Sequence, residues 1–172
     1  GYLWDPPRAK EAFVKAAEIA HRSGRKVALT LSDSFCVERH RADFLRLVEH
    51  HVDILFANEA EICSLYEVGD FDTALQHVRG ECEIAALTRG KRGSLLVAGD
   101  EVHVIDPYPV ETLVDTTGAG DLYAAGVLYG LSQGFGLAHC GRLGSLAAAE
   151  VISHVGARPA VPLADLAASV LV

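Results

Sequence analysis

Residues 115–123 read Asp-Thr-Thr-Gly-Ala-Gly-Asp-Leu-Tyr and lie between an extended segment, residues 110–114, and a long helical stretch. The two glycines let the backbone approach another group closely and adopt dihedral angles that other residues avoid. A helix that begins here directs free N–H groups at whatever lies in front of it. Such a nest of donors suits a phosphoryl group that gains negative charge during transfer. Asp121 lies in the first turn, where its carboxylate can accept a proton from an attacking hydroxyl group.

The same motif has simpler readings. A glycine pair ahead of a helix also fits a purely structural role, in which Asp121 only favours the positive end of the helix dipole. The dinucleotide-binding pattern G-x-G-x-x-G does not fit, because Tyr123 stands in place of its third glycine. No Gly-Lys-Ser/Thr sequence follows, so a Walker A loop is absent as well.

Strands and helices alternate through the first half of the sequence. The apolar patterns predict strands at residues 26–31, 53–57 and 83–88, helices at 8–23, 59–67 and 71–79, and a further amphipathic stretch around Phe44. Gly99 and Asp100 separate two short strands, as in a hairpin, and the sequence from Gly118 onward is mostly helical. This order predicts an α/β fold with a mainly parallel sheet.

Composition excludes several classes of protein. The 172 residues are 50% hydrophobic and 22% charged, as expected of a compact domain with a real core. The net charge of −8 argues against binding to nucleic acid or to an anionic membrane. The four cysteines form no CxxC pair, and we find no signal peptide or membrane-spanning run, so we expect a cytoplasmic protein with free thiols. A homodimer is compatible with the sequence but not specified by it.

The run DTTGAGD, followed by an aromatic residue and then small residues, resembles the C-terminal signature of the ribokinase-like (PfkB) carbohydrate and adenosine kinases. The resemblance implies a three-layer αβα sandwich and transfer of a phosphoryl group from ATP to an alcohol. It assigns the anion hole to Gly118, Ala119, Gly120 and the amide of Asp121. It also implies that Asp121 is the catalytic base.

Two further stretches match this family in order and spacing. Asn58-Glu59-Ala60-Glu61 resembles its N-x-x-E element, which implies that Asn58 and Glu61 support Mg²⁺ through water. One helical turn separates the two side chains, so they can face the same side. The alternative is a helix-capping asparagine followed by an exposed glutamate.

The second stretch, residues 88–93, resembles the T-x-G-x-x-G segment that lies beside the nucleotide, with Thr88, Gly90 and Gly93 at the matching positions. The helix that contains Ser145 is implied to lie against the adenine. An ordinary glycine-rich turn with two solvated basic residues is the alternative for residues 88–93.

A monovalent cation, K⁺, is implied near the end of the family's pattern. Asp115 and Thr117 would bind it together with backbone carbonyls near Val151, His154 and Gly156. Where some relatives have a hydroxyl side chain, this chain has Ala160, so that one ligand is missing.

The resemblance covers nearly the whole chain but only the C-terminal half of such kinases. Methionine is absent, including from position 1, and the opening Gly1-Tyr2-Leu3-Trp4 is typical of the end of a strand. We therefore expect residues 1–172 to be a single domain, the nucleotide-binding and catalytic portion of a larger kinase. The N-terminal half and its β lid, which supply most acceptor-binding residues, would be absent, and the segment alone would be weakly active or inactive.

The acceptor is the least determined feature. Residues 51–61 look especially like adenosine kinases, which favours the 5′-hydroxyl of adenosine, and a carbohydrate such as ribose, fructose or a keto-sugar acid is the second choice. A non-catalytic nucleotide-binding module of the same fold is a third reading, although the aspartate and glycines of the signature are intact. A dinucleotide-binding oxidoreductase is disfavoured by the broken glycine pattern. Trp4 fits either the core or an acceptor-facing strand end.

Overall fold

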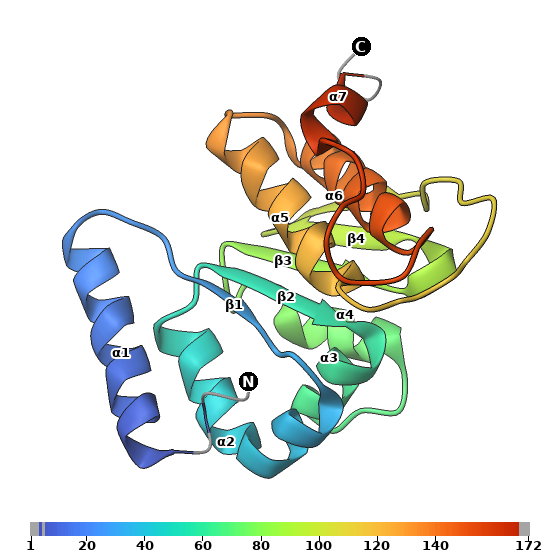
Figure 1. Cartoon of the computed structure of the whole chain (residues 1–172). Helices are drawn as coiled ribbons and strands as arrows, with labels where there is room; N and C mark the ends of the chain where they lie inside the picture. Colours follow the sequence, from blue (N-terminus) through green and yellow to red (C-terminus); the bar gives the residue numbers. More distant parts are fainter. Residues whose placement is uncertain (1–3, 5, 169–172) are drawn as a thin grey trace. The chain divides into compact units, whose positions relative to one another are not determined.

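The computed structural model describes residue 4 and residues 6–168 of the chain. Five strands form one sheet in the order β1-β2-β3-β4-β5, and helices connect or follow them (Figure 1). Strand β1 (Ala28–Thr30) pairs in parallel with β2 (Ile54–Asn58), so that Ala28 lies opposite Ile54. The sheet is mixed and mostly parallel, which confirms the predicted α/β fold class.

The contacts within the chain define two compact units. The first runs from the amino terminus to Leu87 and includes Val97–Glu101, and the second comprises Thr88–Leu96 and the residues from Val102 onward.

In the first unit, helices connect three strands, of which β1 is largely exposed and β2 and β3 are largely buried. The helices are α1 (Pro7–Arg22), α2 (Ser34–His50), α3 (Glu59–Tyr66) and α4 (Phe71–Val78), and the third strand is β3 (Ile84–Thr88). Side chains define the helix starts, because Asp33 accepts a hydrogen bond from the Cys36 amide at 2.8 Å and Asp70 accepts one from the Thr73 amide at 2.8 Å. Four of the five residues of β2, and likewise of β3, are buried, as their apolar sequences predict.

Two predictions for this unit need correction or completion. The first strand is shorter than residues 26–31: the Val27 amide donates to the Asp53 side chain at 2.6 Å and not to a backbone carbonyl of β2, although the Val27 carbonyl oxygen still accepts from the Ile54 amide at 3.1 Å. Trp4 belongs to the core: it is 4% exposed, and its ring stacks on Phe44 with 5.6 Å between the ring centroids. The remainder of the strand end predicted for residues 1–4 lies outside the described residues.

The second unit holds the loops and helices on which the predicted chemistry depends. It contains the 3₁₀ helix η2 (Gly90–Arg92), helices α5 (Ala119–Ser132), α6 (Leu137–Val151) and α7 (Leu163–Ala167), and most of strands β4 (Ser94–Ala98) and β5 (Glu101–Ile105), whose connecting segment Val97–Glu101 belongs to the first unit. Gly99 and Asp100 form the turn between β4 and β5, as predicted. Residues 106–116 contain no helix or strand, so the extended segment 110–114 lies outside the sheet.

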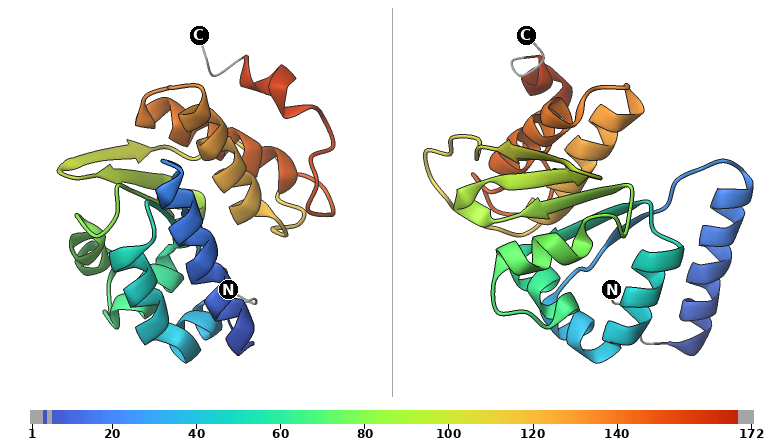
Figure 2. Two further views of the ribbon diagram at one scale, coloured as in Figure 1. Left: turned by 90° about the vertical axis from the view of Figure 1, so that its left-hand side faces the viewer. Right: turned by 180° about the vertical axis from the view of Figure 1, so that it is seen from behind.

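Helices α5 and α6 pack backbone against backbone and lie side by side in both views of Figure 2. A β-carbon on Gly126 of α5 would lie 2.5 Å from the carbonyl oxygen of Leu143, and one on Gly144 of α6 would lie 2.9 Å from that of Tyr123. Neither separation is possible for real atoms, so glycine is required at this contact for steric reasons. In the part of the chain that the structure describes, no helix combines the length and the apolar character needed to cross a membrane.

Candidate active site

Helix α5 begins without a side-chain cap. Its N-cap residue, Gly118, has φ = 83°, a conformation that favours glycine. A β-carbon there would also lie 2.9 Å from the α-carbon of Ala157. Within the described residues, the Ala119 amide donates to Thr116 at 3.2 Å, whereas the amides of Gly118, Gly120 and Asp121 have no protein acceptor. The start of α5 therefore keeps several backbone donors for a ligand, as an anion-binding helix start does.

Asp115 holds the loop in front of this helix. Its Oδ1 accepts hydrogen bonds from the Thr117 amide at 2.9 Å and the Thr117 hydroxyl at 2.7 Å, and its Oδ2 accepts one from the Gly156 amide at 3.0 Å. The Thr117 hydroxyl contributes most to lowering the pKa of Asp115 to about 2, and the amides of Gly156 and Thr117 add to the effect. Asp115 is thus an ionised anchor between the loop before α5 and the loop after α6.

A cavity of about 530 Å³ opens beside the start of α5, entirely within the second unit. This is the volume expected of a pocket for a small organic ligand. Six residues predicted to serve the nucleotide or the anion hole line it together: Thr88, Gly90, Gly93, Ala119, Gly120 and Ser145. They come from three separate parts of the chain, so the fold brings together what the sequence spreads over almost sixty positions.

The loop from Thr88 to Gly93 has a rigid end beside this cavity. The Arg89 amide donates to the carbonyl oxygen of Gly93 at 2.8 Å. Gly93 has φ = 78°, and a β-carbon there would lie 2.0 Å from the carbonyl oxygen of Ile105. Only glycine fits this position, and the loop backbone consequently lies close against the end of β5.

The cavity has a buried polar contact in its wall. The hydroxyl of Tyr123, on α5, donates to the hydroxyl oxygen of Ser94, on β4, at 2.8 Å. Both residues are buried and line the cavity. Burial raises the pKa of Tyr123 to about 12, so the phenol remains a neutral donor at physiological pH.

Sequence reasoning missed one wall of the cavity. Residues of the loop after β5 form it: Pro107, Tyr108, Pro109, Val110 and Leu113. Tyr108 is 39% exposed and Leu113 is 64% exposed, so this wall presents apolar surface to the opening. The Pro-Tyr-Pro run was the available signal, because two prolines stiffen a segment and place it outside a sheet.

Asp121, the predicted catalytic base, is the third residue of α5 and is exposed. Gly118 and Asp121 do not line the cavity themselves, although Ala119 and Gly120 between them do. The carboxylate is therefore next to the cavity along the chain and accessible to a second molecule.

Asn58 and Glu61 belong to the first unit and form a complete capping box at the start of α3. The Asn58 side chain accepts from the Glu61 amide at 2.9 Å, and the Glu61 carboxylate accepts from the Asn58 amide at 2.9 Å and from the Asn58 side-chain amide at 2.6 Å. The capping alternative is thus correct for Asn58, but Glu61 is buried, at 6% exposure, and not exposed as that reading assumed. Burial raises the pKa of Glu61.

The residues predicted to bind a monovalent cation are partly engaged with one another. Asp115 and Thr117 are hydrogen-bonded to each other, and the Gly156 amide joins them. Among the described residues, no group of three or more His, Cys, Asp or Glu side chains is arranged to hold a metal ion.

The profile of the pfkB family carbohydrate kinases matches residues 2–164. The chain belongs to the pfkB family of carbohydrate kinases. The crystal structure of adenosine kinase from Sinorhizobium meliloti is 52% identical, with a TM-score of 0.94, over 98% of this chain and 52% of that one. That of a probable sugar kinase protein from Rhizobium etli CFN 42 is 49% identical, with a TM-score of 0.95, over 98% and 51%.

A curated pfkB-type relative, the cytidine kinase of Thermococcus kodakarensis, is 34% identical over 137 residues, which are 77% of this chain and 49% of that protein. The predicted ribokinase-like fold is confirmed by the similarity to these solved structures. The chain spans about half the length of the curated relatives it matches.

Proposed function

We propose that this chain is the nucleotide-binding and catalytic portion of a larger ATP-dependent kinase that phosphorylates an alcohol group of a small molecule. The observation that carries the proposal is the cavity beside α5. Six residues with predicted roles in binding the nucleotide or the anion line that cavity, next to a helix start with unoccupied backbone donors. Family membership supports the same reaction class.

In this mechanism, the cavity takes the nucleoside part of ATP between the loop of Thr88–Gly93 and the face of α6 that carries Ser145. The amides of Gly120 and Asp121, with that of Gly118, stabilise the negative charge of the phosphoryl group in transfer. Asp121 accepts the proton of the attacking hydroxyl group. Its exposure leaves room for the acceptor to approach.

Asn58 and Glu61 fit a Mg²⁺ ion only if water molecules lie between their oxygen atoms and the ion. The carboxylate of Glu61 and the amide oxygen of Asn58 are hard oxygen ligands, yet the atoms already accept hydrogen bonds within the capping box. Each oxygen keeps a further lone pair, so the pair can accept hydrogen bonds from the waters of a hydrated ion. When bound, Mg²⁺ neutralises phosphate charge. Asp115 and Thr117 remain the proposed ligands of a monovalent cation such as K⁺.

For the acceptor, we propose the 5′-hydroxyl of adenosine. The support is the identity of 52% over almost the whole chain to a protein described as an adenosine kinase. A carbohydrate is the second candidate, because a protein described as a probable sugar kinase is 49% identical over the same span.

The test measures ADP release with MgATP by the full-length protein that contains this chain, with adenosine, cytidine, ribose and fructose as acceptors. We expect turnover that depends on adenosine. Turnover with a sugar alone would keep the mechanism and overturn the acceptor. Absence of turnover with every acceptor, while calorimetry still detects ATP binding, would reject the kinase in favour of a nucleotide-binding module.

A further inference from the structure

Glu150 is a buried carboxylate for which the proposed reaction has no use. It lies one residue before the end of α6, and its side chain is 8% exposed. A negative charge in the last turn of a helix opposes the helix dipole, and burial of a charge is costly unless hydrogen bonds compensate it. Glu150 therefore needs a structural reason to occupy this position.

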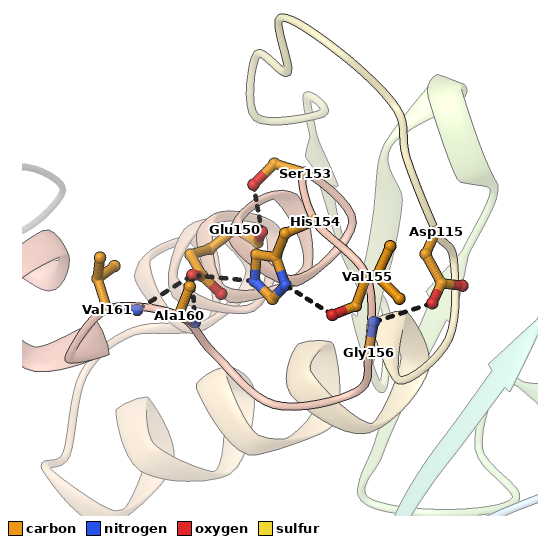
Figure 3. Close-up of polar contacts among 8 residues, drawn as sticks. All are labelled: Asp115, Glu150, Ser153, His154, Val155, Gly156, Ala160 and Val161. Carbon is orange, nitrogen blue, oxygen red and sulfur yellow. Dashed lines mark hydrogen bonds and ion pairs between the residues drawn. The ribbon is translucent and has the colours of Figure 1, made fainter.

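The loop after α6, drawn in Figure 3, supplies the hydrogen-bond donors that compensate the buried carboxylate. Oε1 of Glu150 accepts hydrogen bonds from the Ala160 amide at 2.8 Å, the Val161 amide at 3.3 Å and Nε2 of His154 at 3.3 Å. His154 lies near the start of the loop, whereas Ala160 and Val161 lie at its end. One oxygen atom thus joins the start and the end of the loop of residues 152–161. We call Glu150 and these three hydrogen bonds the Glu150 clasp.

The opposite side of the same loop contacts the start of α5. The Gly156 amide donates to Asp115, which also binds Thr117, and Ala157 lies against Gly118. Figure 3 shows the two carboxylates at opposite ends of the loop, Glu150 on α6 and Asp115 in the segment before α5. The loop therefore connects the Glu150 clasp to the backbone donors of the candidate active site.

We propose that Glu150 is a positioning residue for phosphoryl transfer, acting through the loop of residues 152–161 on the start of α5. This inference rests on the proposed function. Glu150 does not line the 530 Å³ cavity, so it acts on the placement of the donors and not on the nucleoside part of ATP. Its loss is expected to lower kcat while the KM for ATP stays unchanged.

Three substitutions separate the hydrogen bonds from the charge. Glu150→Gln keeps an acceptor oxygen in the place of Oε1, and its NH₂ group takes the place of Oε2, which has no hydrogen-bond partner among the described residues. Glu150→Ala removes the acceptor. Glu150→Asp keeps the charge but is one methylene shorter, so it does not reach the Ala160 and Val161 amides, and it replaces the alanine variant if that variant does not fold.

In the full-length protein, we expect Glu150→Ala to lower kcat by about tenfold to a hundredfold, as misplacement of active-site groups does. The KM for ATP should stay within about twofold, because neither Glu150 nor its hydrogen-bond partners His154, Ala160 and Val161 line the nucleoside cavity. Glu150→Gln should restore kcat to within a few-fold of the wild type. A kcat for Glu150→Ala equal to that of the wild type would overturn the proposal. So would a parallel loss of kcat and ATP affinity in both variants, which indicates a general structural role.

A second measurement on this chain does not depend on turnover. Amide hydrogen exchange is followed at Gly156, which donates to Asp115, and at Leu122, which donates to the carbonyl oxygen of Gly118. Both amides should exchange faster in Glu150→Ala and at the wild-type rate in Glu150→Gln. Unchanged exchange in the alanine variant contradicts the positioning role. Faster exchange in that variant, combined with a wild-type protein that transfers no phosphoryl group, supports the Glu150 clasp and rejects the proposed function.

Discussion

Helices α3 and α5 each have an acidic residue at their third position, Glu61 and Asp121, but the two helix starts are built in opposite ways. At α3, the side chains of Asn58 and Glu61 satisfy each other's amides, and Glu61 is buried. At α5, the N-cap is a glycine without a side-chain acceptor, and Asp121 is exposed. A capped start uses its donors internally, whereas an uncapped one keeps them for a ligand. A carboxylate at the same helix position thus completes a cap in one helix and is exposed in the other.

The largest effect is expected from Asp121→Asn, which keeps the shape of the side chain and removes the base. In the full-length protein, kcat should fall by about 10²–10⁴-fold, the range that general base catalysis contributes. The matched control is Asp165→Asn, because Asp165 is an exposed acid at the third position of α7. A normal kcat for Asp121→Asn, or an equal loss of kcat in the control, would contradict the proposed role of Asp121 as the catalytic base.

Gly118→Ala tests whether the uncapped start depends on glycine. The substitution introduces a β-carbon 2.9 Å from Ala157 and places alanine at φ = 83°, so it should lower the free energy of unfolding by about 1–3 kcal/mol. Gly120→Ala is the control for stability, because nothing lies within 4 Å of its β-carbon and alanine favours a helix. Urea unfolding of the chain distinguishes them, and equal destabilisation by both would contradict the steric argument.

Asn58→Ala removes the side chain that caps the start of α3. Loss of an N-cap side chain typically lowers the free energy of unfolding by about 1 kcal/mol, which urea unfolding can measure. Asn58→Ser is the matched control, since serine is also a good N-cap, and it should recover most of the loss. If the alanine and serine variants have the same free energy of unfolding, the side-chain cap at residue 58 contributes little to the stability of α3.

The smallest effect concerns pH. Burial raises the folded-state pKa of Glu61 above its ordinary value of 4.5, so the folded state favours the protonated form. This contribution to stability is complete below pH 4.5 and is lost as the pH rises through the folded pKa. Relative to Glu61→Gln, the wild type should therefore lose stability as the pH is raised from 4 upward. Urea midpoints across this range give the result, with Glu18→Gln as the control at an exposed position.

Short glycine motifs were the most predictable part of the candidate site. Gly90, Gly93 and Gly120 were predicted from short motifs that resemble those of the family, and they line one cavity with residues predicted from more distant stretches. Periodicity predicted the helices and buried strands for the same reason, since it depends on neighbours in the sequence.

What the sequence did not reveal depends on distant contacts. The burial of Glu61 is set by packing around α3, so the sequence left a metal ligand and an exposed cap residue as its two readings. The first strand begins later than predicted, at a point where the Val27 amide bonds to the side chain of Asp53, which is 26 residues away in the sequence. The wall formed by Tyr108 and its neighbours has no periodic pattern, and it is defined only by the cavity that it closes.

The glycine contact between α5 and α6 has a mechanical consequence. Gly126 lies against the backbone of Leu143 and Gly144, and Gly144 lies against the carbonyl oxygen of Tyr123, so the two helices have little room to slide past each other there. We therefore expect a displacement of α6 to carry α5 with it. In this view the two helices move as one rigid unit, and the backbone donors of Gly118 and Gly120 lie at one end of it.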